Sequence, residues 1–163
     1  MLQALKERRQ DDRGFTLIEL MIVVLIIGIL IAVGLPTFLG ARERAQDRAA
    51  QALLRTGMAA AKTYYTDSNS YDGLAVATIE PIEQSIEWVA TAPADAGPVL
   101  LTVTGTTTVL LTTKSGSGAW FCLKDVSGDS TAANNGIFYG RSTSSTCTAT
   151  DTTAVVGWAP PAA

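Results

Sequence analysis

Histidine is absent from the 163-residue chain. The commonest general base and the commonest metal ligand of proteins are therefore missing. The sequence also lacks a nucleophile elbow, a phosphate-binding glycine loop, a dinucleotide-binding fingerprint and zinc-ligand spacing. Its formal net charge of −3 argues against a surface that coats nucleic acid. These absences predict a protein that is not an enzyme, with no catalytic residue, no cofactor and no bound metal.

Cysteine is scarce, with only Cys122 and Cys147. In an extracytoplasmic domain such a pair predicts a disulfide, whereas in the cytosol two buried thiols are the expected state. Cys147 lies in a Ser- and Thr-rich tail, residues 142–153, which by composition alone would be disordered and suited to O-glycosylation. A bond to Cys122 would close this tail onto the preceding domain. The compartment of the protein therefore decides between the two states.

One long apolar run stands out near the N-terminus. Residues 1–14 are polar and charged, and the 25 residues Phe15–Leu39 that follow are almost wholly apolar. As a helix, this run would be roughly 37 Å long, enough to cross the apolar core of a bilayer, which is about 30 Å thick. We therefore expect a single membrane-spanning helix at residues 15–39.

Three features distinguish this run from a plain anchor. Glu19 places a carboxylate inside it, which costs on the order of 3 kcal/mol when ionised in a membrane. Pro36 interrupts the helical hydrogen bonds and should kink or loosen the helix. The polar segment ending in Gly14 precedes the apolar run, whereas a secretory signal is cut after its apolar core. No Lys or Arg in the run is available to pair with Glu19.

The segment Arg13-Gly-Phe-Thr-Leu-Ile-Glu-Leu20, with the apolar run and Pro36 behind it, closely resembles the N-terminus of type IV pilins and type II secretion pseudopilins. The resemblance is detailed over residues 13–39 and looser beyond. The pair Asp11-Asp12 departs from it by diluting the positive charge of the leader.

The resemblance implies a role for each matching residue. A prepilin peptidase would cut between Gly14 and Phe15, and Phe15 would become an N-methylated N-terminus. Glu19 would pair with the N-terminal amine of a neighbouring subunit, and Pro36 would belong to the assembly helix. A Glu that is protonated, or that sits near a helix start where the dipole favours it, is the alternative. An ion pair between Glu19 and the amine would set the register between subunits more than it would add to the net stability of the filament.

The helix is expected to continue beyond the membrane through residues 40–66, which contain no Pro and much Ala. On a helical wheel its residues form three faces. One face would pack on its own domain and another on a partner, as in a filament core. A helix buried more fully within one domain is the alternative. The faces are a polar stripe of Arg44, Asp47, Arg48, Gln51, Arg55 and Lys62; a face of Ala45, Ala49, Ala52, Leu53, Ala59, Ala60 and Tyr64; and a sector of Leu54, Gly57, Met58, Ala61 and Tyr65.

Residues 67–163 predict a small antiparallel sheet. Val99–Thr104 and Thr106–Thr113 flank Gly105 as a hairpin, and a turn at Ser115–Gly118 leads to a strand at Ala119–Lys124. Ile86–Ala92 is a further candidate strand. The three or four strands need a helix to cover one face, and the N-terminal helix is the only long candidate. The expected fold class is therefore α+β and pilin-like.

One possible metal site remains among the acidic residues. Asp125 and Asp129 flank a loop that contains glycine, and Asp151 follows in the tail. Some pseudopilins bind calcium in a C-terminal loop, but this spacing does not match an EF-hand. Solvated loop carboxylates are therefore the preferred interpretation.

The expected function is that of a type IV pilus subunit. It would be held in the cytoplasmic membrane by one span, with its C-terminal domain outside, and then assembled by a pilus machinery into a homo-oligomeric surface filament. A pseudopilin of a type II secretion system is the close alternative, and a membrane-tethered enzyme or binding module is the alternative from another class. Motility, adhesion, DNA uptake and secretion stay open, as do major and minor subunit roles.

Overall fold

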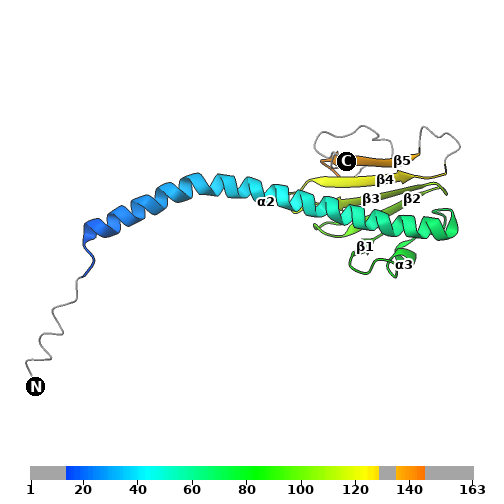
Figure 1. Cartoon of the computed structure of the whole chain (residues 1–163), viewed down its shortest axis with the longest axis horizontal. Coiled ribbons are helices and arrows are strands. Elements are labelled where there is room, and N and C mark those ends of the chain that lie inside the picture. Colours follow the sequence, from blue (N-terminus) through cyan, green and yellow to red (C-terminus); the bar gives the residue numbers. More distant parts are fainter. Residues whose placement is uncertain (1–13, 129–134, 146–163) are drawn as a thin grey trace, which may run out of the picture. The chain divides into compact units, whose positions relative to one another are not determined.

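The structure is a computed structural model that describes residues 14–128 and 135–145. It divides into two compact units, with the boundary between Ala41 and Arg42. A single helix, α2 (Leu17–Ser68), contributes to both units. Figure 1 shows its first part in blue and its second part in cyan and green.

In the first unit, α2 carries the predicted apolar run. Its large apolar side chains between Leu17 and Leu39 are 48–76% exposed, and none is buried. Pro36 lies inside the helix, and helical structure continues on both sides of it. Since Pro36 has no N–H, the helix loses one backbone hydrogen bond here. The Thr37 hydroxyl donates to the carbonyl oxygen of Val33 at 3.2 Å, in the same turn.

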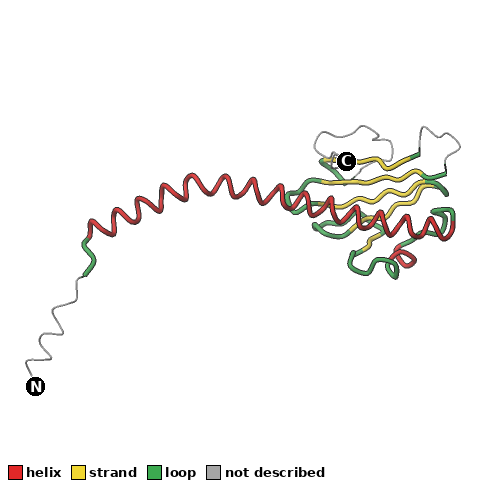
Figure 2. Tube along the Cα trace, in the orientation of Figure 1, coloured by secondary structure: helices red, strands yellow, loops and turns green. Residues whose placement is uncertain are grey.

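In the second unit, the later turns of α2 lie across one face of a five-stranded sheet (Figure 2). The predicted sector of Leu54, Gly57, Met58 and Ala61 is buried, as are Ala50 and Ala60. Together with the inner face of the sheet these residues form one apolar core. The opposite alanines Ala45, Ala49, Ala52 and Ala59 are exposed. The helix is therefore buried on one side only, and the alternative of fuller burial within one domain is wrong.

Glycine permits the closest approach of helix and sheet. A Cβ atom at Gly57 would lie 3.0 Å from Cη2 of Trp88 and 3.2 Å from Cδ1 of Leu111. Both distances are shorter than ordinary carbon contacts, which are about 3.5–4.0 Å. A side chain at this position would therefore push the helix away from the sheet.

The sheet order is β1-β2-β3-β4-β5. The strands are β1 (Trp88–Val89), β2 (Val99–Thr104), β3 (Thr108–Lys114), β4 (Trp120–Val126) and β5 (Gly136–Ser142). The predicted hairpin is confirmed, because β2 and β3 pair antiparallel from Val99–Thr113 to Thr104–Thr108. Gly105 adopts φ +65° in the turn between them. The α+β fold, with a long apolar helix on a mostly antiparallel sheet, is confirmed.

Three details of the sheet differ from prediction. The candidate strand at Ile86–Ala92 shrinks to the two residues of β1, which pair parallel with β2. Strand β5 was not predicted and pairs antiparallel with β4. A short helix, α3 (Val76–Ile79), lies in the segment between α2 and β1. The sheet is therefore larger than expected and has one parallel pair.

Candidate processing and assembly site

The predicted cleavage junction is accessible in the structure. Gly14, Phe15 and Thr16 precede the first residue of α2 and are not helical. The Phe15 side chain is 88% exposed. A peptidase needs a peptide bond that is not locked into a helix, so the Gly14–Phe15 bond is placed where it can be reached. The leader before Gly14 lies outside the described residues.

Glu19 has a partner within its own chain that the sequence argument missed. Its Oε2 accepts hydrogen bonds from the backbone N–H of Thr16 at 3.0 Å and from the Thr16 hydroxyl at 2.8 Å. The Thr16 hydroxyl oxygen in turn accepts from the Glu19 N–H at 3.3 Å. This is a capping box, and the spacing Thr-x-x-Glu at a helix start is its sequence signal. No bond to Glu19 Oε1 occurs among the described residues, so one carboxylate oxygen remains available.

The apolar run presents a continuous surface without cover. Among the described residues, α2 is the one helix long and apolar enough to cross a membrane. Exposure of so many Leu, Ile and Val side chains is unfavourable in water, at about 25 cal/mol for each Å². This part of α2 can therefore be covered by lipid or by the helices of other chains.

Asp47 lies in the first turns of α2 that belong to the second unit, and it joins them to the sheet. Its Oδ1 accepts hydrogen bonds from the hydroxyls of Ser115, at 2.7 Å, and Ser117. Both serines lie in the turn between β3 and β4. Oδ2 lies 3.9 Å from a guanidinium nitrogen of Arg141 on β5. Asp47 was predicted as part of the polar stripe of the helix, and within the second unit it joins α2 to the β3–β4 turn and to β5.

Asp125 on β4 is fully buried and forms the second polar attachment. Its Oδ2 accepts from the hydroxyls of Tyr71, at 2.6 Å, and Ser127, at 2.5 Å. Its Oδ1 lies 2.8 Å from the ammonium of Lys62 on α2. Burial, followed by the Asp125 carboxylate, raises the pKa of Tyr71 well above its usual value.

The preferred interpretation of Asp125 as a solvated carboxylate is therefore wrong. The Lys62 cation and two hydroxyls already occupy its oxygens, so it is not available as a calcium ligand. Asp129 and Asp151 lie outside the described residues. Residues 14–128 and 135–145 contain no group of three acidic, Cys or His side chains that could hold a metal ion.

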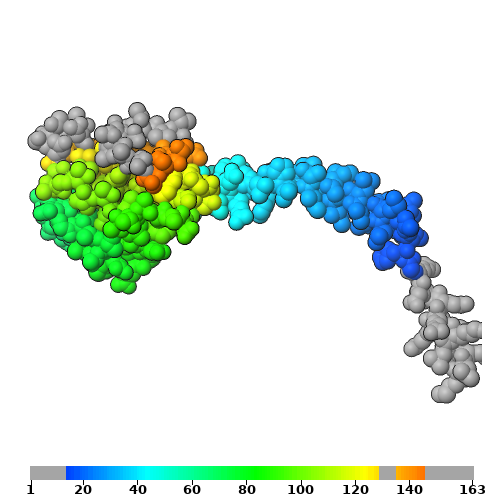
Figure 3. Space-filling view, turned by 180° about the vertical axis from the view of Figure 1, so that it is seen from behind, coloured from blue at the N-terminus to red at the C-terminus, as the bar shows by residue number. Residues whose placement is uncertain are grey.

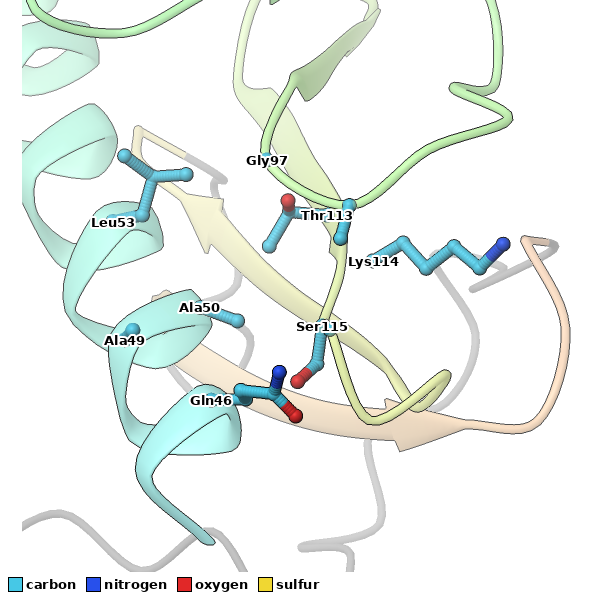
Figure 4. Close-up of a pocket in the computed structure, with 10 residues that line it drawn as sticks. Gln46, Ala49, Ala50, Leu53, Gly97, Thr113, Lys114 and Ser115 are labelled. Carbon is cyan, nitrogen blue, oxygen red and sulfur yellow. The ribbon is translucent and has the colours of Figure 1, made fainter. Parts of the chain in front are cut away.

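Two hollows on the surface of the second unit lie beside α2. The first, about 330 Å³, lies between an early turn of α2 and the β3–β4 turn (Figure 4), and most of its walls are small residues. The second, about 370 Å³, is lined by Glu43, Asp47, Ser117 and Arg141 among others. There Asp47 is already bound to two hydroxyls. The hydroxyl contacts of Asp47 in the second hollow are the ones that join α2 to the β3–β4 turn.

The predicted disulfide is only half within the described residues. Cys122 is buried on β4, between Thr112 of β3 and Gly140 of β5. Cys147 and residues 146–153 of the tail lie outside the described residues. The bond between Cys122 and Cys147 therefore stays a prediction.

Comparison with known proteins gives a consistent result. The family described as a prokaryotic N-terminal methylation motif matches residues 9–35. The major component of the wide type IV pilus of Thermus thermophilus, PilA4, is 34% identical over 112 residues, which cover 69% of this chain and 81% of the relative. A fimbrial protein of Neisseria meningitidis is 36% identical and covers 76% of this chain and 80% of the relative.

A type II secretion system core protein G from Klebsiella michiganensis is also similar. It is 34% identical over 64 residues, which is 39% of this chain and 45% of the relative. No solved structure matches the chain. The similarity to the pilus proteins thus extends over much more of the chain than the similarity to the secretion protein.

Proposed function

Because the chain belongs to the type IV pilin family, we propose that it is a structural subunit of a type IV pilus. A prepilin peptidase would remove residues 1–14, and the new N-terminal residue, Phe15, would be methylated. The subunit would wait in the cytoplasmic membrane with α2 spanning it and the second unit outside. A pilus assembly machinery would then transfer it into a homo-oligomeric filament.

The exposed apolar part of α2 is the observation that carries this proposal. A helix with no buried side chain between Leu17 and Leu39 needs cover in every state of the protein. Lipid provides it before assembly, and the same helix of neighbouring subunits provides it in the filament. The exchange replaces one apolar environment with another, so the subunit can leave the membrane without exposing this surface to water.

Within this proposal, Glu19 pairs with the N-terminal amine of a neighbouring subunit. The capping box uses only Oε2, and Oε1 is left for a cation. Before assembly, the two hydrogen bonds from Thr16 offset part of the free energy that it costs to hold the Glu19 carboxylate in an apolar helix. The ion pair would then specify register between subunits. Pro36 would contribute a turn of the assembly helix with one fewer backbone hydrogen bond.

A pseudopilin of a type II secretion system is the second candidate. The similarity to a secretion core protein supports it but spans 39% of this chain, against 69% for the pilus component from Thermus thermophilus. The longer similarity includes residues beyond α2 and favours a pilus. The relatives' names describe pilus components, which supports a structural role over an enzymatic one.

We also infer that Cys122 and Cys147 are bonded in the exported protein. Because the second unit would fold outside the cytoplasm, the compartment permits a disulfide. The chain-entropy argument gives about 3.5 kcal/mol for closing a loop of roughly 25 residues. The bond would hold the Ser- and Thr-rich tail beside β4.

Electron microscopy of cells with and without the protein tests the proposed function. Long surface filaments that disappear with the gene and return on complementation are the expected result. Unchanged filaments in the deletion, or no filaments in either strain together with a defect in protein secretion, would favour the pseudopilin.

A further inference from the structure

Charge is segregated within the second unit. From residue 63 to residue 113 the chain has six acidic residues and no Lys or Arg. Between residues 42 and 62, α2 has five basic residues and two acidic ones. The segment from α3 to β1 is therefore negative, and the early turns of α2 in this unit are positive.

Three residues from each region define two surfaces of opposite charge, an acidic patch and a basic stripe. The acidic patch is Glu80, Glu83 and Glu87, which lie between α3 and β1. The basic stripe is Arg44, Arg48 and Arg55, which share one face of α2 because they are four and seven residues apart. All three arginines are exposed, as are Glu80 and Glu87, and Glu83 is half-buried.

The two surfaces do not neutralise each other within one chain. The ion pairs of the described residues are Lys62–Asp125 and Arg141–Asp47, and neither involves the acidic patch or the basic stripe. Glu83 accepts hydrogen bonds from the hydroxyl and the N–H of Ser85, which hold its pKa below the usual value. Within residues 14–128 and 135–145, the three acidic and three basic side chains of these surfaces thus have no partner of opposite charge.

The surfaces are offset along α2. Trp88, directly after Glu87, packs against Gly57. In Figure 3 the green surface around residues 75–90 lies on the lower side of this unit. The offset applies to Arg44 and Arg48, which precede Gly57 by 13 and 9 residues, or roughly 20 and 14 Å along the helix. Arg55 is only two residues from Gly57, yet it forms no ion pair among the described residues.

An open recess lies beside Glu80. It has a volume of about 340 Å³ and is lined by Glu80, Pro81 and Gln84. A guanidinium can donate to the carboxylate and to the glutamine amide oxygen at the same time. The acidic patch therefore places a carboxylate and an amide group beside an open recess, where an arginine of another chain could reach both.

We infer that the acidic patch of one subunit binds the basic stripe of a second copy, displaced along the helix axis. Two different surfaces that bind head to tail generate a ring if the rotation closes and an open helical filament if it does not, whereas a self-complementary surface generates a closed dimer. A displacement along the helix axis prevents closure and gives the filament. The contact rests on the proposed function and adds to it, because it lies outside the apolar helix half. It would select register by charge and weaken with added salt.

Charge reversal tests the contact. The acid-reversed chain carries Glu80→Lys with Glu87→Lys, and the base-reversed chain carries Arg44→Glu with Arg48→Glu. Expressed alone, each reversed chain should reduce the yield of filaments by a factor of about ten or more, because like charges would face each other. A matched control, Asp67→Lys with Asp72→Lys, changes net charge as much as the acid reversal but lies outside the patch and should assemble normally.

Co-expression of the two reversed chains separates a lost contact from a folding defect. Alternating subunits would again place opposite charges together, so filaments should return, with both chains in them and both cleaved after Gly14. Filaments from either reversed chain alone at wild-type yield would overturn the inference, as would failure of the two chains to rescue each other. Absence of filaments from wild-type cells would overturn the proposed function and this inference together.

Discussion

The ammonium nitrogen of Lys62 lies 2.8 Å from Oδ1 of Asp125 and joins the last turns of α2 to the end of strand β4. The Asp125 side chain is fully buried, and that of Lys62 is 43% exposed. Apart from this cation, Oδ1 has no partner among the described residues. A buried carboxylate therefore depends on a half-exposed lysine from another element.

Removing that cation should destabilise the second unit. We expect Lys62→Met to lower the free energy of unfolding by about 1–3 kcal/mol, since it leaves a buried charge without its partner. Arg55→Met, a matched change at an exposed position of the same helix, should cost less than about 0.5 kcal/mol. Denaturant unfolding of the full chain in detergent, followed by near-UV circular dichroism, measures both. Equal costs for the two variants would show that the Lys62–Asp125 pair contributes nothing specific.

Tyr71 should make stability depend on alkaline pH. Its pKa is raised from the usual 10.0 in the folded state, so the folded chain holds the hydroxyl proton more tightly than the unfolded chain. This contribution is fully present below about pH 10 and is lost as pH rises above it. Between about pH 9 and 11, wild type should lose more stability than Tyr71→Phe, which cannot ionise there. Parallel pH curves for the two proteins would contradict the assignment.

Gly57 should resist substitution although it lies within a helix. Helix propensity alone favours Leu over Gly by about 0.8 kcal/mol. Here the added side chain would meet Trp88 and Leu111, so we expect Gly57→Leu to cost about 1–3 kcal/mol from overpacking. Ala52→Leu, at an exposed position of the same helix, should be close to neutral. A higher denaturation midpoint for Gly57→Leu would show that the helix does not pack this closely on the sheet.

Two substitutions of Glu19 separate its two roles. Glu19→Gln keeps an amide oxygen that can accept from Thr16 and so preserves the cap, but it removes the charge. Glu19→Ala removes both. Both variants should insert and be cleaved, and both should assemble poorly if the charge pairs with a neighbour. Filament yield from Glu19→Gln equal to wild type, with loss only in Glu19→Ala, would assign Glu19 to capping alone.

The sequence predicted those parts of the protein whose signals are local. The apolar run, the helix after it and the hairpin around Gly105 follow from composition, periodicity and turn residues within short windows. Thr16 and Glu19 also form a local signal, since a capping box spans four residues. The predictions made for the Glu19 carboxylate were pairing with a cation, protonation and stabilisation by the helix dipole, and they did not include a hydrogen bond from Thr16.

The parts not predicted depend on contacts between distant residues. The hydroxyl of Tyr71 reaches Asp125 across 54 positions of the chain, and no pattern near either residue marks the pair. Strand β5 begins at Gly136 and contains Gly140, so its residues have a low propensity for strands. The stabilisation of this strand comes from its antiparallel pairing with β4, which no local pattern indicates. The parallel pairing of β1 with β2 has no local signal either.

The most direct test is the mass of this chain in filaments sheared from the cell surface. The account predicts that the chain is present, that it begins at Phe15 and carries a methyl group there, and that Gly14→Val leaves uncut precursor in the membrane and none in filaments. A chain that begins at Met1, one cut after the apolar run, or its absence from filaments would contradict the account.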